Sequence, residues 1–251
     1  MSERPNELIS KIMRHIVARG FKSLSLRQLG NMKTYTKSDL KTYIKSMHNK
    51  RPSLFRGDFI SIETDILSKV TNAQQITSLN LDTLLNGLDF APNNLETSNF
   101  EAFLAELRTI YWLSDLGFTN IYPIKAKKKI SQPDFIAKYK NHNAIIDAYC
   151  MTFTNQQKPD PVLNVFINSH DKLLQTIKSK FNEEKKPQLN ILTSQIEIFL
   201  CVINSEPIKN TNDTYDFKNY LEQVYNDLSL ELPYYLGICT GTDDCIYPSL
   251  Q

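Results

Sequence analysis

Three acids in this chain of 251 residues have types and spacing that could support chemistry: Glu106, Asp134 and Asp147. Glu106 lies in FEAFLAELRTIYWL, Asp134 follows a proline in SQPDFIAKYK, and Asp147 interrupts the apolar run NAIIDAYCM. A carboxylate in an apolar strand is costly to bury without a partner. We therefore expect a metal ion or a buried hydrogen-bond network at these acids. A structural salt bridge, for example with Lys138, is the alternative.

The elements around the two aspartates should bring them together. The polar KNHN segment between two alternating runs predicts a β-hairpin that turns at its Asn-His pair. If Lys140 pairs with Asn143, then Asp134 faces Tyr149. Because side chains alternate along a strand, Asp147 is expected on the same face of the sheet.

The preceding helix carries two glutamates, and its geometry separates them. Ser98 and Glu101 match an S-x-x-E capping box, which gives Glu101 a role at the helix start. At 100° per residue, Glu106 falls about 40° from Ile110 on the apolar stripe, whereas Glu101 points away from it. Glu106 is therefore the better candidate for a buried acid, with a carboxylate at the edge of the stripe as the alternative.

The order of these segments resembles the core of the PD-(D/E)XK nucleases: a helix with Glu, a strand, a strand with Pro-Asp, a strand with acid-x-Lys, a helix and a strand. The resemblance covers residues 98–204. It implies an α/β fold with a restriction-endonuclease-like mixed sheet flanked by helices. It also implies that Asp134, Asp147 and Glu106 bind Mg²⁺ or Mn²⁺, which would polarise the scissile phosphate and activate water for phosphodiester hydrolysis.

The chain departs from the family pattern at the lysine of the motif, where it has Tyr149. A phenol donates one hydrogen bond but supplies no cation at neutral pH. Loss of one such stabilising group costs about 10²–10³ in rate. In the expected hairpin register, Lys138 lies diagonal to Asp147, so Lys138 is the candidate replacement and a catalytic residue with the three acids.

Charge is distributed unevenly along the chain. Residues 1–60 contain 13 Lys/Arg against 4 Asp/Glu, whereas the remainder contains 16 against 23. A basic N-terminal block before an acidic body suggests that contact with a polyanion begins in the first block. An ordinary solvated basic surface is the alternative.

The basic block has a pattern that fits a winged helix-turn-helix. Helical spacing is seen in residues 6–19, in a shorter segment from residue 25, and in SDLKTYIKSMHNK, for which Thr36 or Ser38 offers an N-cap. FRGDFISIE would be a small strand. The third helix would present basic residues to nucleic acid, and a helical packing subdomain is the alternative. The residues expected to bind nucleic acid are Lys41, Lys45, Lys50 and Arg51.

Three regions are predicted: a basic helical region at 1–62, a helical linker region at 63–96, and a nuclease-like α/β domain at 97–251. In the last region we expect helices at 99–116, 161–182 and 214–230. The expected strands are 119–125, 133–140, 143–151, 195–204 and 234–240.

The apolar runs, the cysteines and the absence of glycine motifs limit the classes of protein to which the chain could belong. No apolar run reaches the roughly 18 residues that span a bilayer, and the N-terminus lacks a secretory signal, so an intracellular, cytoplasmic protein without membrane contact is expected. The four cysteines form no CxxC pair and are expected to be reduced core thiols. No phosphate-binding or hydrolase glycine motif is present. DNA is the expected partner, and a homodimer or larger complex stays open.

Three functions stay open from the sequence. The first is a DNA-binding, Mg²⁺-dependent endonuclease. The second is a catalytically inactive pseudo-nuclease that binds DNA or protein, and the third is an interaction protein in which the acids are structural.

Overall fold

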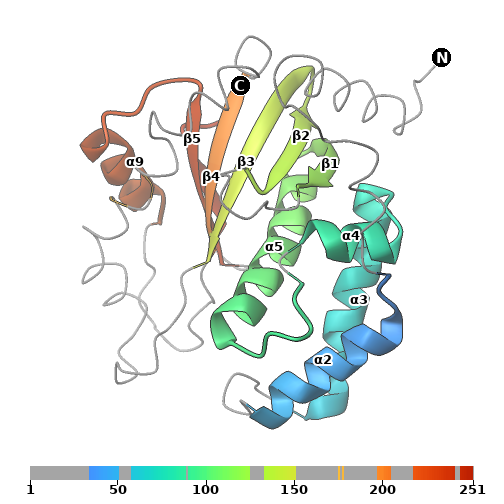
Figure 1. The fold of residues 1–251 in the computed structure, drawn as a ribbon. Helices are drawn as coiled ribbons and strands as arrows, with labels where there is room; N and C mark the ends of the chain where they lie inside the picture. The colour runs from blue at the N-terminus through green and yellow to red at the C-terminus, as the bar shows by residue number, and fades with distance from the viewer. Residues whose placement is uncertain are drawn as a thin grey trace, which may run out of the picture.

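A computed structural model of the chain describes residues 34–50, 58–88, 90–124, 133–150, 175, 177, 197–204, 217–240 and 244–250. Within these ranges the chain forms an α/β fold around one mixed sheet (Figure 1). The strands are adjacent in sequence order: β1 (Phe118–Pro123), β2 (Phe135–Tyr139), β3 (His142–Cys150), β4 (Ile198–Asn204), β5 (Tyr234–Cys239) and β6 (Cys245–Tyr247).

The strand directions change in the middle of the sheet. β1, β2 and β3 form an antiparallel meander, β3, β4 and β5 run parallel, and β6 returns antiparallel to β5. The predicted strands near 119–125, 133–140, 143–151, 195–204 and 234–240 are therefore confirmed in the described residues. β4 is buried along its whole length, which agrees with its continuous apolar run and its central position.

Within the described residues, five helices accompany this sheet: α2 (Lys37–Lys50), α3 (Phe59–Thr77), α4 (Leu81–Gly87), α5 (Thr97–Asp115) and α9 (Phe217–Asp227). α2 and α5 confirm the helices expected there, and α9 falls within the range 214–230. Thr36 caps α2, because the Asp39 N–H donates to Thr36 Oγ1 at 3.2 Å. Of the expected helix at 161–182, the structure describes only residues 175 and 177, which are helical.

Each face of the sheet has its own hydrophobic cluster. α5 packs on the face that presents Ile146, Leu200 and Val202, and this cluster continues into the N-terminal helices. α9 packs on the opposite face, against Cys201, Ile203, Leu236 and Ile238. The two helices accordingly lie on opposite sides of the sheet in Figure 1.

The helices before α5 share its core. Tyr43 of α2 packs edge-on against Phe90 and Phe100, with ring centroids 5.2 and 5.6 Å apart. Gly87 at the end of α4 lies so close to β1 that a Cβ atom there would be 2.7 Å from Pro123 Cγ. The core is thus continuous across the boundary expected near residue 96.

Two local predictions were wrong. FISIE begins helix α3 and is not a strand, because Asp58 caps it: Asp58 Oδ1 accepts from Ser61 N at 3.0 Å. Ser98 does not cap α5, which begins at Thr97 with Glu96 as its N-cap residue. The strand of the expected winged helix is therefore a helix, while the segments at 6–19 and 25–32 lie outside the described residues.

The four cysteines are all described, and none of them forms a disulfide bond. Cys201 and Cys239 are buried, which agrees with the expectation of reduced core thiols. Among the described helices, none is long and apolar enough to cross a bilayer.

Candidate functional site

Asp134 lies just before β2 and is fixed by three hydrogen bonds. Its N–H donates to the carbonyl of Ile146 at 3.0 Å, and its own carbonyl accepts from the N–H of Ile124 at 2.7 Å. Its side-chain Oδ2 accepts from the N–H of Ala148 at 2.7 Å. Ile146 and Ala148 flank Asp147 in the sequence. Asp134 is therefore hydrogen-bonded to both sequence neighbours of Asp147 on the adjacent strand. The structure therefore brings these two predicted acids together.

The hairpin register differs from the expected one by two residues. Lys138, not Lys140, pairs with Asn143, and Tyr139 pairs with His142. The turn falls one residue earlier because Lys140 adopts the left-handed conformation, with φ of 52°. A shift of two residues preserves the faces of the strands, but it moves Asp134 beside Asp147 and away from Tyr149.

The corrected register removes Lys138 from its expected place near Asp147. Lys138 pairs with Asn143, four residues before Asp147 on β3. At about 3.3 Å per residue, this separation is roughly 13 Å along the strand. The prediction that Lys138 lies diagonal to Asp147 is wrong, so the geometric argument for Lys138 as a replacement of the motif lysine is lost.

Asp147 and Tyr149 are on the α9 face of β3. Ile146 and Ala148 pack into the cluster beneath α5, and the alternation of side chains therefore turns Asp147 to the other face. Tyr149 packs at the margin of the α9 cluster, level with Ile203 of β4. The Tyr149 phenol is thus partly enclosed by apolar side chains.

Glu106 is buried, as helix geometry predicted, with 7% of its surface exposed. It lies on α5, which packs on the face opposite the one that Asp147 presents. No group of three or more His, Cys, Asp or Glu residues that could hold a metal ion is found among the described residues. The structure therefore places Asp134 against the part of β3 that carries Asp147, and it assigns Glu106 to a different layer.

Two residues near Glu106 were not singled out from the sequence. Thr109 of α5 and Asn204 at the end of β4 are both fully buried, and Asn204 Nδ2 donates to Thr109 Oγ1 at 3.0 Å. Thr109 Oγ1 donates in turn to the carbonyl of Ala105 at 2.9 Å. The sequence does contain a signal for Asn204, because it is the one amide residue in the otherwise apolar strand IFLCVIN and it stands at the end of that strand.

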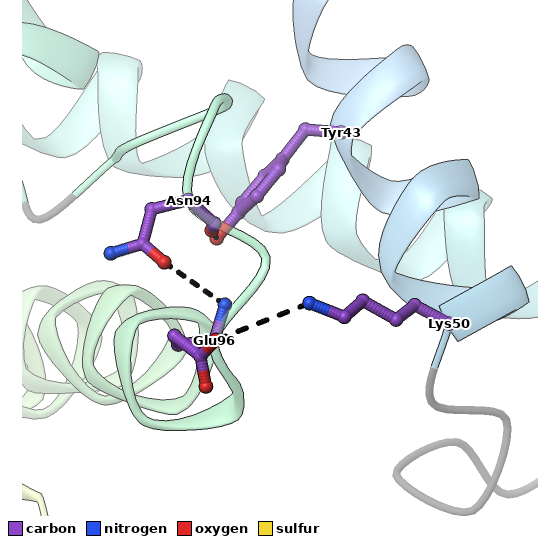
Figure 2. Close-up of polar contacts among 4 residues, drawn as sticks. All are labelled: Tyr43, Lys50, Asn94 and Glu96. Atoms are coloured by element: carbon purple, nitrogen blue, oxygen red, sulfur yellow. Dashed lines mark hydrogen bonds and ion pairs between the residues drawn. The ribbon is translucent and has the colours of Figure 1, made fainter.

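The predicted nucleic-acid-binding lysines lie on the exposed side of α2. Lys41 Nζ is 3.1 Å from Glu63 Oε1 of α3. Lys50 Nζ is 4.0 Å from Glu96 Oε1 (Figure 2). Lys45 is exposed. Arg51 lies outside the described residues. Surface pairs of this kind contribute little, so Lys41 and Lys50 could exchange their carboxylates for phosphates at low cost.

The loop that receives Lys50 is anchored on α2. Tyr43 Oη donates to the carbonyl of Asn94 at 3.3 Å, and Asn94 Oδ1 accepts from the N–H of Glu96 at 3.0 Å (Figure 2). Burial raises the pKa of Tyr43 to about 12, so this phenol stays protonated at neutral pH. These contacts fix the basic helix to the start of α5.

Comparison with known proteins leaves the site to be interpreted from its own geometry. No protein-family model, curated protein or solved structure matches the chain.

Proposed function

We propose that this protein binds DNA and hydrolyses phosphodiester bonds in a reaction that depends on Mg²⁺ or Mn²⁺, using a PD-(D/E)XK-like core. The observation that carries the proposal is that Asp134, just before β2, is hydrogen-bonded to Ile146 and Ala148, the two residues that flank Asp147. Support also comes from the order α5, β1, β2, β3, β4, with an antiparallel meander followed by a parallel strand. This order agrees with the arrangement that the family resemblance implies.

The donor set of Asp134 and Asp147 fits a hard divalent cation. Mg²⁺ retains several waters and is usually bound through one or two carboxylates together with substrate phosphates. A carboxylate has about four lone-pair positions, so it can accept a main-chain hydrogen bond, as Asp134 does from Ala148 N–H, and still bind a cation. When bound, the cation would polarise the scissile phosphate and lower the pKa of a bound water.

The residues of the chain would contribute mainly by positioning. The hydrogen bonds to β1 and β3 hold the Asp134 carboxylate in place before substrate arrives. Tyr149 brings no positive charge, because a phenol is neutral at neutral pH. We therefore expect slow cleavage, about 10²–10³ below that of a site with the motif lysine.

The test is cleavage of supercoiled plasmid with Mg²⁺ or Mn²⁺ at high protein concentration. Wild type should nick the plasmid, and Asp147→Asn should abolish nicking because it removes a ligand charge with little change in shape. Asp115→Asn, an exposed position at the end of α5, is the matched control and should keep full activity. Equal products from wild type and Asp147→Asn would refute catalysis at this site.

The second candidate is a pseudo-nuclease that binds DNA without cutting it. Two observations favour it: Tyr149 packs against the α9 cluster, and Glu106 lies on the other face from Asp147. In this case the wild type would retard a DNA duplex in a salt-dependent way and leave plasmid intact. Binding that is unchanged in Asp147→Asn, together with no nicking by wild type, would select this candidate.

A further inference from the structure

One side of α2 carries three lysines in a single row. Lys37, Lys41 and Lys45 are spaced four residues apart, and all three are exposed. Residues four apart on a helix lie one above the other, separated by about 6 Å along its axis. The row lies beside the stripe of α2 that packs into the core, which consists of Leu40, Tyr43, Ile44 and Met47.

The exposed residues next to this row are neutral and can donate hydrogen bonds. At 100° per residue, Ser38, Asn49 and Thr42 follow the row around the helix within about 60°, and all three are exposed. The single acid of α2, Asp39, lies on another side. Its Oδ2 atom accepts a hydrogen bond from the Thr36 hydroxyl at 2.6 Å. This side of α2 therefore combines positive charge with hydrogen-bond donors, and both kinds of group bind phosphate oxygens.

Lys50 is exposed as well, but it does not belong to the row. It lies about 140° around the helix from Lys45. Its Nζ atom is 4.0 Å from Glu96 Oε1, at the start of α5 (Figure 2). A ligand that lies along the row would therefore not reach Lys50.

One carboxylate from a neighbouring helix reaches the middle of the row. Glu63 Oε1 of α3 is 3.1 Å from Lys41 Nζ, and the Lys41 side chain is 54% exposed. Among the described residues, no acid lies within ion-pair distance of Lys37 or Lys45. Surface ion pairs contribute little stability, so a phosphate can take the place of Glu63 at Lys41.

We propose that Lys37, Lys41 and Lys45 form one phosphate-binding row, which holds the backbone of duplex DNA without reading its bases, and that Glu63 competes with the DNA for Lys41. This inference rests on the proposed function, because it takes DNA as the ligand. Phosphates of one strand follow one another at about 3.4 Å along the duplex axis, so a row about 12 Å long can meet about three of them. Lysine binds phosphate as a point charge, which carries no sequence information.

The test of the row compares two pairs of substitutions that remove the same charge. Binding of two duplexes of unrelated sequence is measured in EDTA, which prevents cleavage, over a range of salt concentrations. Lys37→Gln with Lys45→Gln should weaken binding of both duplexes by the same factor, about tenfold or more, and lower the salt slope by about two. Lys50→Gln with Lys69→Gln changes two ion-paired lysines outside the row and should leave binding nearly unchanged.

The test of the competition uses the Glu63–Lys41 pair. Glu63→Gln should strengthen binding about two- to fivefold, because Lys41 then has no carboxylate partner to leave. Asp65→Asn removes the same charge from the pair with Lys69 and should have little effect. In a Lys41→Gln background the gain from Glu63→Gln should disappear.

The row is refuted if the Lys37→Gln, Lys45→Gln protein binds DNA as tightly as wild type or as tightly as the Lys50→Gln, Lys69→Gln protein. A loss confined to one of the two duplexes overturns the absence of base reading. A gain from Glu63→Gln that persists with Lys41→Gln overturns the competition. The proposed function fails by a different result, a wild-type protein that binds neither duplex and does not nick plasmid.

Discussion

On the α9 face of the sheet, Asp147 lies next to Asp134 of the neighbouring segment. The Asp134 carboxylate accepts a hydrogen bond from the Ala148 N–H at 2.7 Å. On the α5 face, Asn204 is fully buried beside Thr109 and keeps one oxygen without a partner among the described residues. On the first face, the Asp134 carboxylate finds its partner in the main chain of the neighbouring strand of the hairpin. The second encloses polar groups in a large core, where a missing partner costs more. The comparison shows that the two faces carry their polar residues for different physical reasons.

The packing of the α5 face should be the more sensitive to a small change. Gly237→Ala would place a Cβ atom 2.3 Å from Trp112 Cη2, so we expect a loss of about 3 kcal/mol in the free energy of unfolding. Urea unfolding measures the loss. In a Trp112→Leu background the penalty of Gly237→Ala should fall below about 1 kcal/mol, and an undiminished penalty would contradict the close contact.

Substitutions of the two aspartates on the α9 face should differ in their effect on the free energy of unfolding, although the proposed cleavage needs both side chains. Asp134→Ala leaves the Ala148 N–H without its acceptor and should cost about 1–2 kcal/mol. Asp134→Asn keeps an acceptor oxygen and should cost less. Asp147→Asn should leave the urea midpoint nearly unchanged, and a larger loss there than in Asp134→Ala would reverse these assignments.

Charge on α2 offers a comparison outside the sheet. If the proposed DNA interface includes α2, Lys45→Glu should weaken binding of a DNA duplex about tenfold and lower the salt slope by about one, since it would remove one phosphate contact and add a repulsive charge. Lys69→Glu is the matched control on α3, where Lys69 pairs with Asp65 at 2.7 Å. Equal effects of the two changes on DNA binding would show that α2 does not form part of a DNA interface.

The smallest expected effect is a difference in acid sensitivity between the N-terminal caps of two helices, α3 and α4. Hydrogen bonds from the Ser61 hydroxyl and N–H lower the pKa of Asp58 at the start of α3, whereas α4 is capped by the uncharged Asn80. A lowered pKa in the folded state stabilises the protein above the ordinary pKa of about 4, and this contribution is lost as pH falls through the folded value.

Urea unfolding between pH 6 and pH 3 tests this difference. Wild type should lose slightly more stability on acidification than Asp58→Asn, which retains a capping side chain without a titratable group. Identical pH profiles would show that the Asp58 cap contributes no acid dependence.

Several parts of the fold could be predicted from local pattern. Alternation predicted β2 and β3, and the continuous apolar run IFLCVIN predicted a buried β4. The stripe on α5 correctly selected Glu106 as the buried acid. FISIE misled because alternation over five residues is weaker evidence than the cap that Asp58 provides for α3.

The sequence by itself determined the α/β class, the order of α5 and the strands β1 to β5, and the proximity of Pro-Asp to the acid of the next strand. These features depend on periodicity and on short-range connection, which a single chain displays directly. Only the tertiary structure decided the hairpin register, the separation of Glu106 from Asp147 and the meeting of Thr109 with Asn204. Register depends on the conformation of one turn residue, Lys140, and the layer of a side chain depends on which helix covers which face. Thr109 and Asn204 are 95 residues apart, so only the packing of α5 against the end of β4 could bring them together.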